Sequence, residues 1–516
     1  MATKVVTAAF ALCLMTGFLF VVPAAADPGT LYVSALGSDG SGSNCTLPDT
    51  PCATLTYALT QAGSGSTIDM AGTVDDNVTV NTPVTITQWP GGSPAVVDGG
   101  AINSVFTIAS GVTATLDQLT IQDGAASAAG GGIDVNANAN LTVTSSTVTA
   151  NNADTGGGIS NAGTLTVTGT TLSGNTATAA SGVGGGGIDN VSGATTTLTD
   201  STVSGNSAVS GAGLYNSGTT FVTDSTVSGN MGDLGGGDGG GIDNESSLNL
   251  SDSTLSGNSS SAGGGLYNGS LAVLDDSTVS GNSVTAANSP PGSGSGILND
   301  AGSTALAGDI VATPGGAPAG GECFGGGFYD GGYNVDDDGS CGLHASTSVS
   351  DSASIDSYLG PLADNGGPTQ TVALTAGTVS SPNPAQAVIP ASFVSPYGGG
   401  RASCSQPDQR GVARSAPCDM GSFALSTPTA PTITSATSGT FTVGTAGSFE
   451  VTASGSPAPT FSETGVLPDG VTLAGDGLLS GTPDPTTGGS YPITIGATNG
   501  VSPDATQAFT LTVDEA

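Results

Sequence analysis

The sequence contains very few positive charges. Its 516 residues include only 4 Lys and Arg in total, against 41 Asp and Glu, so the formal net charge is −37. A protein that binds nucleic acid needs Lys and Arg to neutralise phosphates, and docking on an anionic membrane surface needs the same residues. The composition therefore argues against both kinds of partner.

Aromatic and charged residues are scarce as well. Aromatic residues make up 4% of the chain, charged residues 9%, and there is one His and one Trp, whereas Gly occurs 85 times. So much glycine argues against a wide hydrophobic core, while the regular recurrence of Val, Leu and Ile argues against disorder. Beyond the N-terminal segment, no stretch approaches the ~18 apolar residues of a membrane-spanning helix. We therefore expect no membrane insertion of the mature chain.

The N-terminus has the pattern of a targeting segment. Lys4 begins a short positive region, residues 5–22 are almost wholly apolar, and Ala24–Ala26 offer small residues for cleavage. This order predicts a secretory signal peptide over residues 1–26, with the mature chain starting at Asp27 and localised outside the cell or on its surface. An uncleaved membrane anchor is the alternative interpretation.

The cysteines agree with export. Removing Cys13 with the signal peptide leaves six of the 7 cysteines, and they occur as three pairs that are close in sequence. Metal binding is the alternative, but the chain has neither a Cys-x-x-Cys motif nor a His cluster. Proximity therefore favours three local disulfides in an oxidising compartment. The predicted pairs are Cys45–Cys52, Cys323–Cys341 and Cys404–Cys418.

Two short blocks repeat in alternation through the middle of the chain. The first block, Ser146–Asn151, reads Ser-Thr-Val-Thr-Ala-Asn and returns five times in related form. The second, Gly130–Asp134, reads Gly-Gly-Gly-Ile-Asp and returns in step with the first. The last residues of the first block lie 24 to 31 positions apart, at Asn151, Asn175, Asn206, Asn230, Asn258 and Asn282. Such a period indicates a repeat architecture.

The composition of the repeat selects a parallel β-helix. Gly, Thr, Ser and Asn are poor helix formers, which excludes helical repeats, and the period is too short for a propeller blade. Leu165–Thr168 alternates apolar and polar residues, as expected for a strand with Val167 facing the core. Coils of such strands stack at about 4.8 Å. We expect the Asn column to stack as a hydrogen-bonded ladder, with a polar ligand strip as the alternative.

The flanks of the repeat resemble known families. Residues 27–100 are expected to form the first coils with a cap, including one short helix over residues 54–62, and resemble the start of secreted pectin-lyase-like right-handed β-helix proteins. The repeat itself is placed at residues 101–345. Three later blocks are similar to the closing region of bacterial choice-of-anchor Q surface proteins, which implies that residues 346–424 close the solenoid. These blocks are Gly360–Gln370, Asp408–Arg414 and Cys418–Phe423.

The C-terminal part predicts a separate β-sandwich. Residues 425–431 are rich in Pro and Thr and are expected to be a linker. Residues 432–516 contain alternating segments with frequent turn signals, which favours a small sandwich. Leu467–Leu473 and Gly477–Pro483 resemble an immunoglobulin-like, cadherin-like repeat of bacterial surface proteins. The predicted fold is therefore all-β: a right-handed parallel β-helix followed by an immunoglobulin-like sandwich.

The pectin-lyase-like resemblance raises the question of catalysis. It implies that a lyase would use an Arg or Lys base beside calcium-binding Asp, but the coils contain neither Arg nor Lys. The blocks implied for polygalacturonase-like hydrolases are missing too, and the only His, His344, lacks a nucleophile context. We therefore expect a non-catalytic surface protein that is adhesive or carbohydrate-binding, with a polysaccharide or cell-surface glycan as partner.

One set of residues keeps the enzyme alternative open. In successive coils, the residue after each Gly-Gly-Ile block or its equivalent is Asp134, Ser160, Asp189, Tyr215, Asp243 and Tyr267. Asp189 and Asp243 are then expected two coils apart, at about 9–10 Å, near the ~6.5–9.5 Å between the carboxyl groups of inverting glycosidases. Tyr215 and Tyr267 could stack on sugar rings. The favoured interpretation of the alternation is relief of carboxylate repulsion, with sugar binding ahead of hydrolysis or a lyase reaction.

Two further columns carry hypotheses. Asp200, Asp224, Asp252 and Asp276 occupy one position in four consecutive coils, about 5 Å apart, and no Lys or Arg of the coils can neutralise them. Screening by salt, raised pKa values or bound calcium would relieve this repulsion, and calcium is the only cofactor that the sequence indicates. Threonine pairs, as in ice-binding solenoids, are a remote alternative function, because the array is short. These pairs are Thr142/Thr144, Thr166/Thr168 and Thr197/Thr199.

Overall fold

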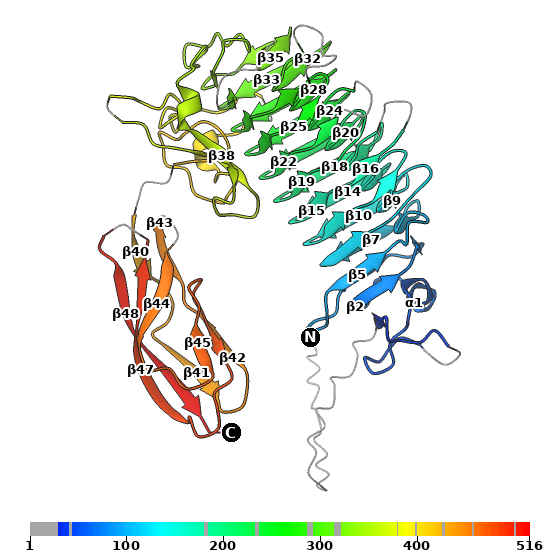
Figure 1. Ribbon diagram of the computed structural model, residues 1–516, viewed down its shortest axis with the longest axis vertical. Coiled ribbons are helices and arrows are strands. Elements are labelled where there is room, and N and C mark those ends of the chain that lie inside the picture. The colour runs from blue at the N-terminus through cyan, green and yellow to red at the C-terminus, as the bar shows by residue number, and fades with distance from the viewer. Residues whose placement is uncertain are drawn as a thin grey trace, which may run out of the picture.

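The computed structural model describes most of residues 29–515 as two strand-rich parts (Figure 1). The described residues are 29–40, 44–179, 184–232, 237–285, 293–313, 321–378, 380–397, 400–425, 429–456, 459–499 and 502–515. The predicted signal peptide lies outside them. The first part is a stack of short strands that forms a β-solenoid, and the second is a C-terminal domain with sheets of its own. This architecture confirms the predicted all-β fold.

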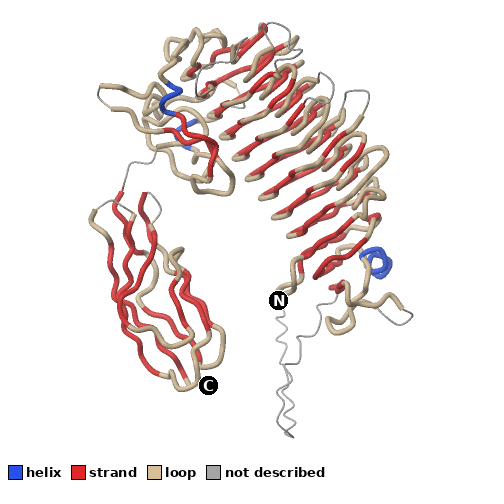
Figure 2. The backbone as a smooth tube through the Cα atoms, in the orientation of Figure 1, coloured by secondary structure: helices blue, strands red, loops and turns tan. Residues whose placement is uncertain are grey.

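Three long parallel sheets run along the solenoid, and the tube in Figure 2 shows their strands as regular rungs. Sheet A consists of β1 (Thr30–Ser34), the first half of β2 (Ser66–Asp75), β4 (Val84–Gln88), β7 (Thr113–Asp117), β10 (Asn140–Thr144), β14 (Thr164–Thr168), β18 (Thr195–Thr199), β21 (Thr219–Thr223), β25 (Ser247–Ser251), β29 (Leu271–Asp275), β33 (Ser303–Ala307) and β36 (Phe328–Asp330). Sheet B consists of the second half of β2, β5 (Ala95–Asp98), β8 (Leu119–Gln122), β11 (Thr147–Thr149), β15 (Thr171–Ser173), β19 (Thr202–Ser204), β22 (Thr226–Ser228), β26 (Thr254–Ser256), β30 (Thr278–Ser280), β34 (Ile310–Ala312) and β37 (Val335–Asp336).

Sheet C lies on a third side of each coil and has ten strands. They are β3 (Val78–Val80), β6 (Phe106–Ile108), β9 (Ile133–Val135), β13 (Ile159–Asn161), β17 (Ile188–Asn190), β20 (Leu214–Asn216), β24 (Ile242–Asn244), β28 (Leu266–Asn268), β32 (Ile297–Asn299) and β35 (Cys323–Gly325). Two-residue strands pair beside it: β12 (Asn152–Ala153) with β16 (Thr176–Ala177), and β23 (Met231–Gly232), β27 (Ser259–Ser260) and β31 (Ser283–Val284) with one another.

The interior of the solenoid is filled by the apolar residues of the alternating strands. Leu165 and Val167 have no exposed surface, whereas Thr166 between them is half-buried on the outside of sheet A. The same alternation recurs along sheet A, so each coil contributes the same few side chains to one continuous core. This confirms the one-face-buried strands expected from the sequence. The narrow core also explains how a chain so rich in glycine can fold.

The predicted asparagine ladder is present. From Asn151 to Asn282, each side-chain amide donates to the side-chain oxygen of the next Asn in the column, at 2.9–3.0 Å. A second ladder, which we did not expect, runs through the last residue of the sheet C strands at 2.7–2.9 Å. Its members are Asn161, Asn190, Asn216, Asn244, Asn268 and Asn299. Both columns are buried, so these bonds satisfy polar groups that water cannot reach.

The third glycine of each Gly-Gly-Gly block is required by the first ladder. A Cβ on Gly241 would lie 2.5 Å from the carbonyl oxygen of Gly265 in the next coil and 3.0 Å from Nδ2 of Asn258. Both distances are too short for carbon, so only glycine lets the backbone pass this close to the ladder. The two repeated blocks therefore depend on each other.

A short helix packs beside the first strands of the solenoid. Helix α1 (Leu55–Gln61) is capped by the Thr54 side chain, which accepts a hydrogen bond from the Tyr57 amide at 3.1 Å. Its Leu55 joins the solenoid core. The disulfide Cys45–Cys52 ties the preceding loop, and all three predicted disulfides are present.

The closing region, defined here as residues 346–424, folds back along the outside of sheet B. It contains two 3-10 helices (Ile355–Tyr358 and Ser403–Ser405) and the hairpin of β38 (Leu359–Ala363) and β39 (Thr371–Leu374). The side-chain amide of Gln409 donates a hydrogen bond from Nε2 to Thr226 Oγ1 at 2.9 Å and accepts one at Oε1 from Thr254 Oγ1 at 2.6 Å. The backbone N–H of Ser422 donates a hydrogen bond to Thr278 Oγ1 at 3.0 Å. Polar side chains on three successive coils therefore hold this region.

The C-terminal domain forms three small sheets around a core of its own, which includes Phe441, Leu479 and Phe509. Its strands are β40 (Thr429–Ile433), β41 (Ser438–Thr442), β42 (Gly447–Glu450), β43 (Ala453–Ser456), β44 (Thr460–Gly465), β45 (Val471–Leu473), β46 (Leu478–Gly481), β47 (Gly489–Thr498) and β48 (Ala505–Asp514). Strand β40 already begins inside the segment expected to be a linker.

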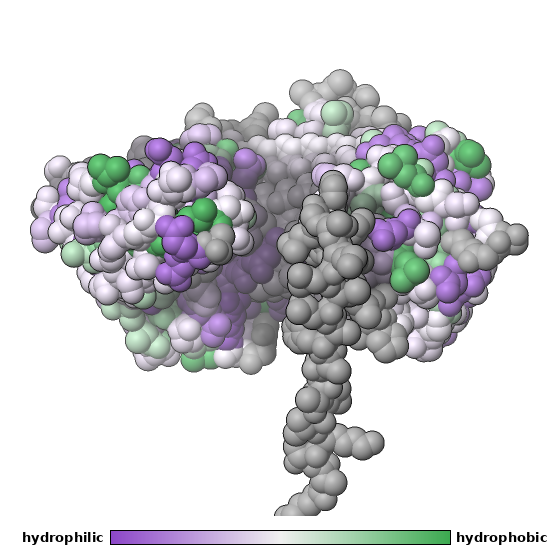
Figure 3. Space-filling view, turned by 90° about the horizontal axis from the view of Figure 1, so that it is seen from below, coloured by the Kyte–Doolittle hydropathy of each residue, from purple (hydrophilic) through white to green (hydrophobic). Residues whose placement is uncertain are grey.

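The coloured part of the face in Figure 3 is mostly pale, and its hydrophobic residues form small separate patches. On sheets A and B, the outward positions of β14 and β19 are Thr and Ser. Charged or aromatic side chains that gather on one sheet therefore stand out as candidate functional groups.

Candidate functional site

The middle residue of each sheet C strand points away from the core. In β17, Ile188 and Asn190 have no exposed surface and face inwards, so Asp189 between them faces outwards. The strand register aligns these middle residues into one row, which we call the sheet C column. From N- to C-terminus it reads Thr79, Thr107, Asp134, Ser160, Asp189, Tyr215, Asp243, Tyr267, Leu298 and Phe324. The predicted order from Asp134 to Tyr267 is confirmed.

The two carboxylates of the enzyme hypothesis are both deeply buried. Asp189 is 6% exposed and Asp243 is 3% exposed, and Tyr215 lies between them in the register. Burial raises the pKa of both side chains, well above the ordinary value for Asp243, where Glu245 and Asp238 raise it further. A glycosidase pairs one protonated with one ionised carboxyl group, which requires that the two pKa values lie apart. Both pKa values are raised here, and the rise is marked for Asp243.

One carboxyl oxygen of Asp243 also lacks a hydrogen-bond partner among the described residues. Among the described residues, its Oδ1 atom is buried and has no hydrogen-bond partner. Buried carboxylate oxygens are normally paired with a donor or a cation, because leaving them unpaired costs free energy. Within the column, Asp243 is therefore the residue whose carboxyl group a ligand could stabilise most by supplying a hydrogen-bond donor or a positive charge.

The two tyrosines of the column are half-buried. Burial, followed by the charges of Asp243, Glu245 and Asp189, raises the pKa of Tyr215 to about 12. The Tyr267 hydroxyl donates to Asp300 at 3.1 Å, and burial together with this bond raises its pKa further above the ordinary value. Both phenols thus stay protonated, each with a hydroxyl donor and a ring at the surface.

Three acidic residues beside the column were missed by the sequence analysis. Asp238 precedes β24, Glu245 follows it, and Asp300 follows β32. Their charges act on the column, since Glu245 and Asp238 raise the pKa of Asp243 and Asp300 raises that of Tyr267. A signal was present in the sequence, because Glu245 and Asp300 come immediately after the Asn that ends their strands.

The N-terminal end of the sheet C column opens into a polar cavity of about 360 Å³. Thr79, Thr107 and Asp134 of the column line it, together with Asn77. A neighbouring cavity of about 330 Å³ shares Asn77 and Thr79 and is bounded by Thr56 of α1. Hydroxyl and amide groups of this kind can exchange hydrogen bonds with a hydroxyl-rich ligand. The sequence analysis did not anticipate these cavities.

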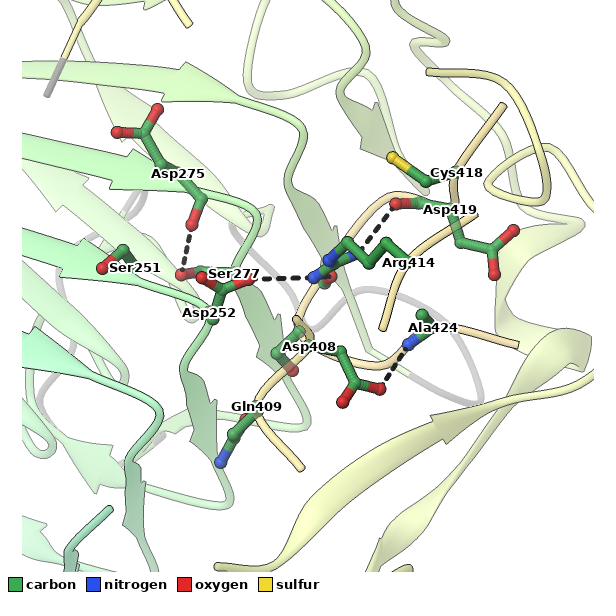
Figure 4. A network of polar contacts seen from close by, with 12 residues as sticks. Ser251, Asp252, Asp275, Ser277, Asp408, Gln409, Arg414, Cys418, Asp419 and Ala424 are labelled. Carbon is green, nitrogen blue, oxygen red and sulfur yellow. Dashed lines mark hydrogen bonds and ion pairs between the residues drawn. The ribbon is translucent and has the colours of Figure 1, made fainter. Parts of the chain in front are cut away.

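The aspartate column forms the corner between sheets A and B. All four residues have left-handed backbone conformations, with φ between 41° and 52°, which Asp tolerates better than most residues. These residues are Asp200, Asp224, Asp252 and Asp276. Arg414 of the closing region pairs with Asp252 at 3.0 Å, as Figure 4 shows, and Arg401 pairs with the same carboxylate. The sequence analysis considered only charges within the coils and so missed both arginines.

The two arginines offset only part of the repulsion between the carboxylates of this column. Burial raises the pKa of Asp224 to about 7, and Asp252 and Asp200 raise it as well. Burial also raises the pKa of Asp276 to about 7, although Arg414 opposes the shift. Within the described ranges, no group of three or more His, Cys, Asp or Glu side chains is arranged to hold a metal ion. Calcium binding by the column stays a prediction.

The threonine pairs lie on sheet A, where Thr142, Thr166 and Thr197 are aligned as expected. Phe221, which is 43% exposed, follows them and interrupts the array. Sheet B carries a longer Thr column that the sequence analysis did not single out, but the closing region buries it from Thr226 onwards. The freely exposed threonine surface is therefore short.

Comparison with known proteins places only the C-terminal domain in a family. Residues 430–514 match the family described as Putative Ig domain. This confirms the immunoglobulin-like domain expected from the sequence. No curated protein matches the chain.

Solved structures show limited similarity. Two from Bacteroides fragilis, described as a putative alpha-galactosidase and a putative alpha-galactosidase/melibiase, are 24% and 21% identical. Each match covers 16% of this chain and 17% of the other, with a TM-score of 0.15. A pectate lyase, Pel9A, is 14% identical over 76% of this chain and 96% of its own, with a TM-score of 0.45. In the part of the chain that is described, no helix is long and apolar enough to cross a membrane.

Proposed function

We propose that this protein is a secreted, non-catalytic carbohydrate-binding protein, and that its glycan lies along the sheet C column. The observation that carries the proposal is the alternation of Tyr215 and Tyr267 with Asp189 and Asp243 on one outward face. Aromatic rings stack on the apolar faces of sugars, and carboxylates accept hydrogen bonds from sugar hydroxyls. The polar cavity beside Thr79 extends the same face with neutral hydrogen-bonding groups.

The non-catalytic part of the proposal is supported by the spacing of the column and by the arginines. Asp189 and Asp243 are two coils apart, or about 10 Å. This is at the upper limit of the ~6.5–9.5 Å that separates the carboxyl groups of inverting glycosidases. The arginines, which could supply a base or stabilise charge, are all held in ion pairs with Asp252 or Asp408.

The setting of the protein is part of the proposal. Three disulfides, the N-terminal signal pattern and the immunoglobulin-like domain fit a protein exported to the cell surface. The resemblance of the closing blocks to choice-of-anchor Q proteins supports a surface protein of that type. In that setting the β-helix acts as an adhesin that holds a polysaccharide or a cell-surface glycan.

A glycan array with the purified mature chain tests the proposal. We expect binding to a defined glycan class, and its loss in the Tyr215→Ala and Tyr267→Ala variants. Tyr329→Ala is the matched control, because Tyr329 is 53% exposed on sheet A, away from the column. Equal loss in all three variants, or no binding at all, would overturn the glycan site on sheet C.

A polysaccharide-degrading enzyme is the second candidate, favoured only by the aligned carboxylates. Incubation with acidic and neutral polysaccharides, followed by analysis of the products, separates the two functions. Reproducible cleavage that disappears in Asp189→Asn and Asp243→Asn would establish the enzyme. Binding without cleavage supports the adhesive function.

A further inference from the structure

The acidic groups of sheet C form one electrostatic cluster. Asp243 lies at its centre, with Asp238 and Glu245 on the same coil, Asp189 two coils before and Asp300 two coils after. The charge of each carboxylate raises the pKa of a neighbouring group on this face. Asp189 and Asp243 raise the pKa of Tyr215, and Asp300 raises that of Tyr267. Asp238 raises the pKa of Asp243, and Glu245 raises that of Asp238. We call this set the acidic row.

Among the described residues, the acidic row has no counter-charge. The described residues contain no Lys, and their three Arg side chains pair with Asp252 and Asp408, on the side of the solenoid covered by the closing region. No arginine contributes to the pKa of Asp243, Asp238 or Asp189. The sheet C face is therefore a negative surface that the protein leaves uncompensated.

A second observation indicates a ligand at this surface. Asp243 is 3% exposed, it faces outwards into the row, and its Oδ1 has no partner among the described residues. A buried carboxyl oxygen in such a position lacks the hydrogen bond that would offset its desolvation, and a positive charge beside it would favour the ionised form over the protonated form that burial stabilises. Nothing in the described part of the chain supplies such a group, which is the state expected of a site for a cationic ligand.

The arrangement fits an extended cation better than a single ion. Asp189, the acids around Asp243, and Asp300 follow one another at steps of two coils, or about 10 Å, and the described residues contain no cluster suited to a metal. Tyr215 and Tyr267 alternate with the acids along the same line. A chain of sugar rings that carries ammonium groups would stack on the tyrosines and pair with the carboxylates.

We propose that the ligand of the acidic row is a polycationic glycan, that is, a polysaccharide of N-deacetylated amino sugars. This inference rests on the proposed glycan-binding function and narrows it to one substrate class. A polymer of uronic acids is disfavoured, because its carboxylates would meet Asp189, Asp243 and Glu245 without any positive charge between them. A neutral glycan leaves Asp243 without a positively charged partner.

Calorimetric titration with defined oligosaccharides tests the inference. The ligands are fully N-acetylated glucosamine oligomers, fully deacetylated oligomers of the same length, and oligogalacturonates, all at a mildly acidic pH that keeps the amines protonated. We expect the deacetylated oligomers to bind at least roughly tenfold more tightly than the acetylated ones, with an affinity that falls as salt is added. Oligogalacturonates are expected not to bind.

Charge-matched variants show where the ligand binds. Asp243→Asn keeps the shape of the side chain and should reduce the affinity for the deacetylated oligomer roughly tenfold, without weakening any binding of the acetylated one. Glu245→Gln is a second variant at an exposed position of the row, in case the buried site tolerates no change. Asp364→Asn removes one negative charge from an exposed turn of the closing region and is expected to bind like the parent protein.

The outcomes separate this inference from the proposed function. Equal binding of acetylated and deacetylated oligomers would overturn the polycation inference while the glycan site stands. Binding of no oligosaccharide would overturn both. If an oligolysine of equal charge binds as tightly as the deacetylated oligomer, the row is a general cation-binding surface and the assignment to a glycan is wrong.

Discussion

The first asparagine ladder makes a quantitative prediction at Asn206. Its Oδ1 accepts from the backbone amide of Asn175 at 2.9 Å and from the Asn175 side chain at 3.0 Å. Its Nδ2 donates to the Leu172 carbonyl at 3.1 Å and to Asn230 Oδ1 at 3.0 Å. Asn206→Ala removes all four bonds and leaves their partners buried. At a net value of about 1 kcal/mol per bond, the expected loss is about 4 kcal/mol.

The measurement combines urea unfolding, followed by circular dichroism, with hydrogen exchange of peptides from the coil that contains Asn206. Asn282→Ala is a graded comparison, because Asn282 ends the ladder and makes three side-chain bonds, so we expect about 3 kcal/mol. Ser204→Ala is the control on the same coil, since Ser204 is half-buried on the outside, and its effect should stay within about 0.5 kcal/mol. A loss at Asn206 no larger than that of Ser204→Ala would refute the ladder argument.

Three further predictions concern the closing region and the net charge. Arg414→Met leaves Asp252 paired only with Arg401. We therefore expect the free energy of unfolding in urea to fall by about 3–5 kcal/mol and amide hydrogen exchange in the closing region to become faster. Unchanged hydrogen exchange would contradict a stabilising role of this ion pair. Because the folded-state pKa values of Asp224 and Asp276 are raised to about 7, their contribution to stability is complete below the unfolded value of 3.8 and is lost as the pH rises through 7. The thermal midpoint should therefore fall between about pH 4 and pH 7, and Asp276→Asn should reduce the fall; a midpoint that rises with pH would reject this sign. Since the net charge is −37 and salt screens the repulsion between like charges, added NaCl should raise the thermal midpoint. Replacing Na⁺ by Ca²⁺ at constant ionic strength should leave the midpoint unchanged. A further rise that is lost in Asp224→Asn would instead support calcium at the aspartate column.

The repeated part of the fold was predictable because each coil carries its own markers. The Asn that ends the first block and the glycines of the second recur in the coils from Asn151 to Asn282, so the register of Asp189, Tyr215 and Asp243 follows from counting blocks, whatever the length of the loops between them. The disulfides were predictable for a similar reason, since each joins cysteines that are close in sequence.

The closing region was not predictable in the same way. Arg414 and Asp252 are 162 positions apart, and no periodic signal relates them. The Thr column of sheet B looks the same in the sequence where it is half-buried, at Thr171, and where it is covered, at Thr254. Which coils are covered depends on how far the chain folds back, and this is decided by side-chain contacts that the local pattern does not contain.

The folded-back closing region has a consequence for how the length of this protein can change in evolution. Gln409 and Ser422 together bridge three consecutive coils, at Thr226, Thr254 and Thr278, so a coil gained or lost there would put every contact out of register. Coils before β19 make no such contacts in the described chain and can be duplicated as whole units of 24 residues, like the one from Asn151 to Asn175. Lineages can therefore lengthen or shorten the N-terminal half while the C-terminal half stays constant. Such changes would alter the number of outward positions on sheet C one coil at a time.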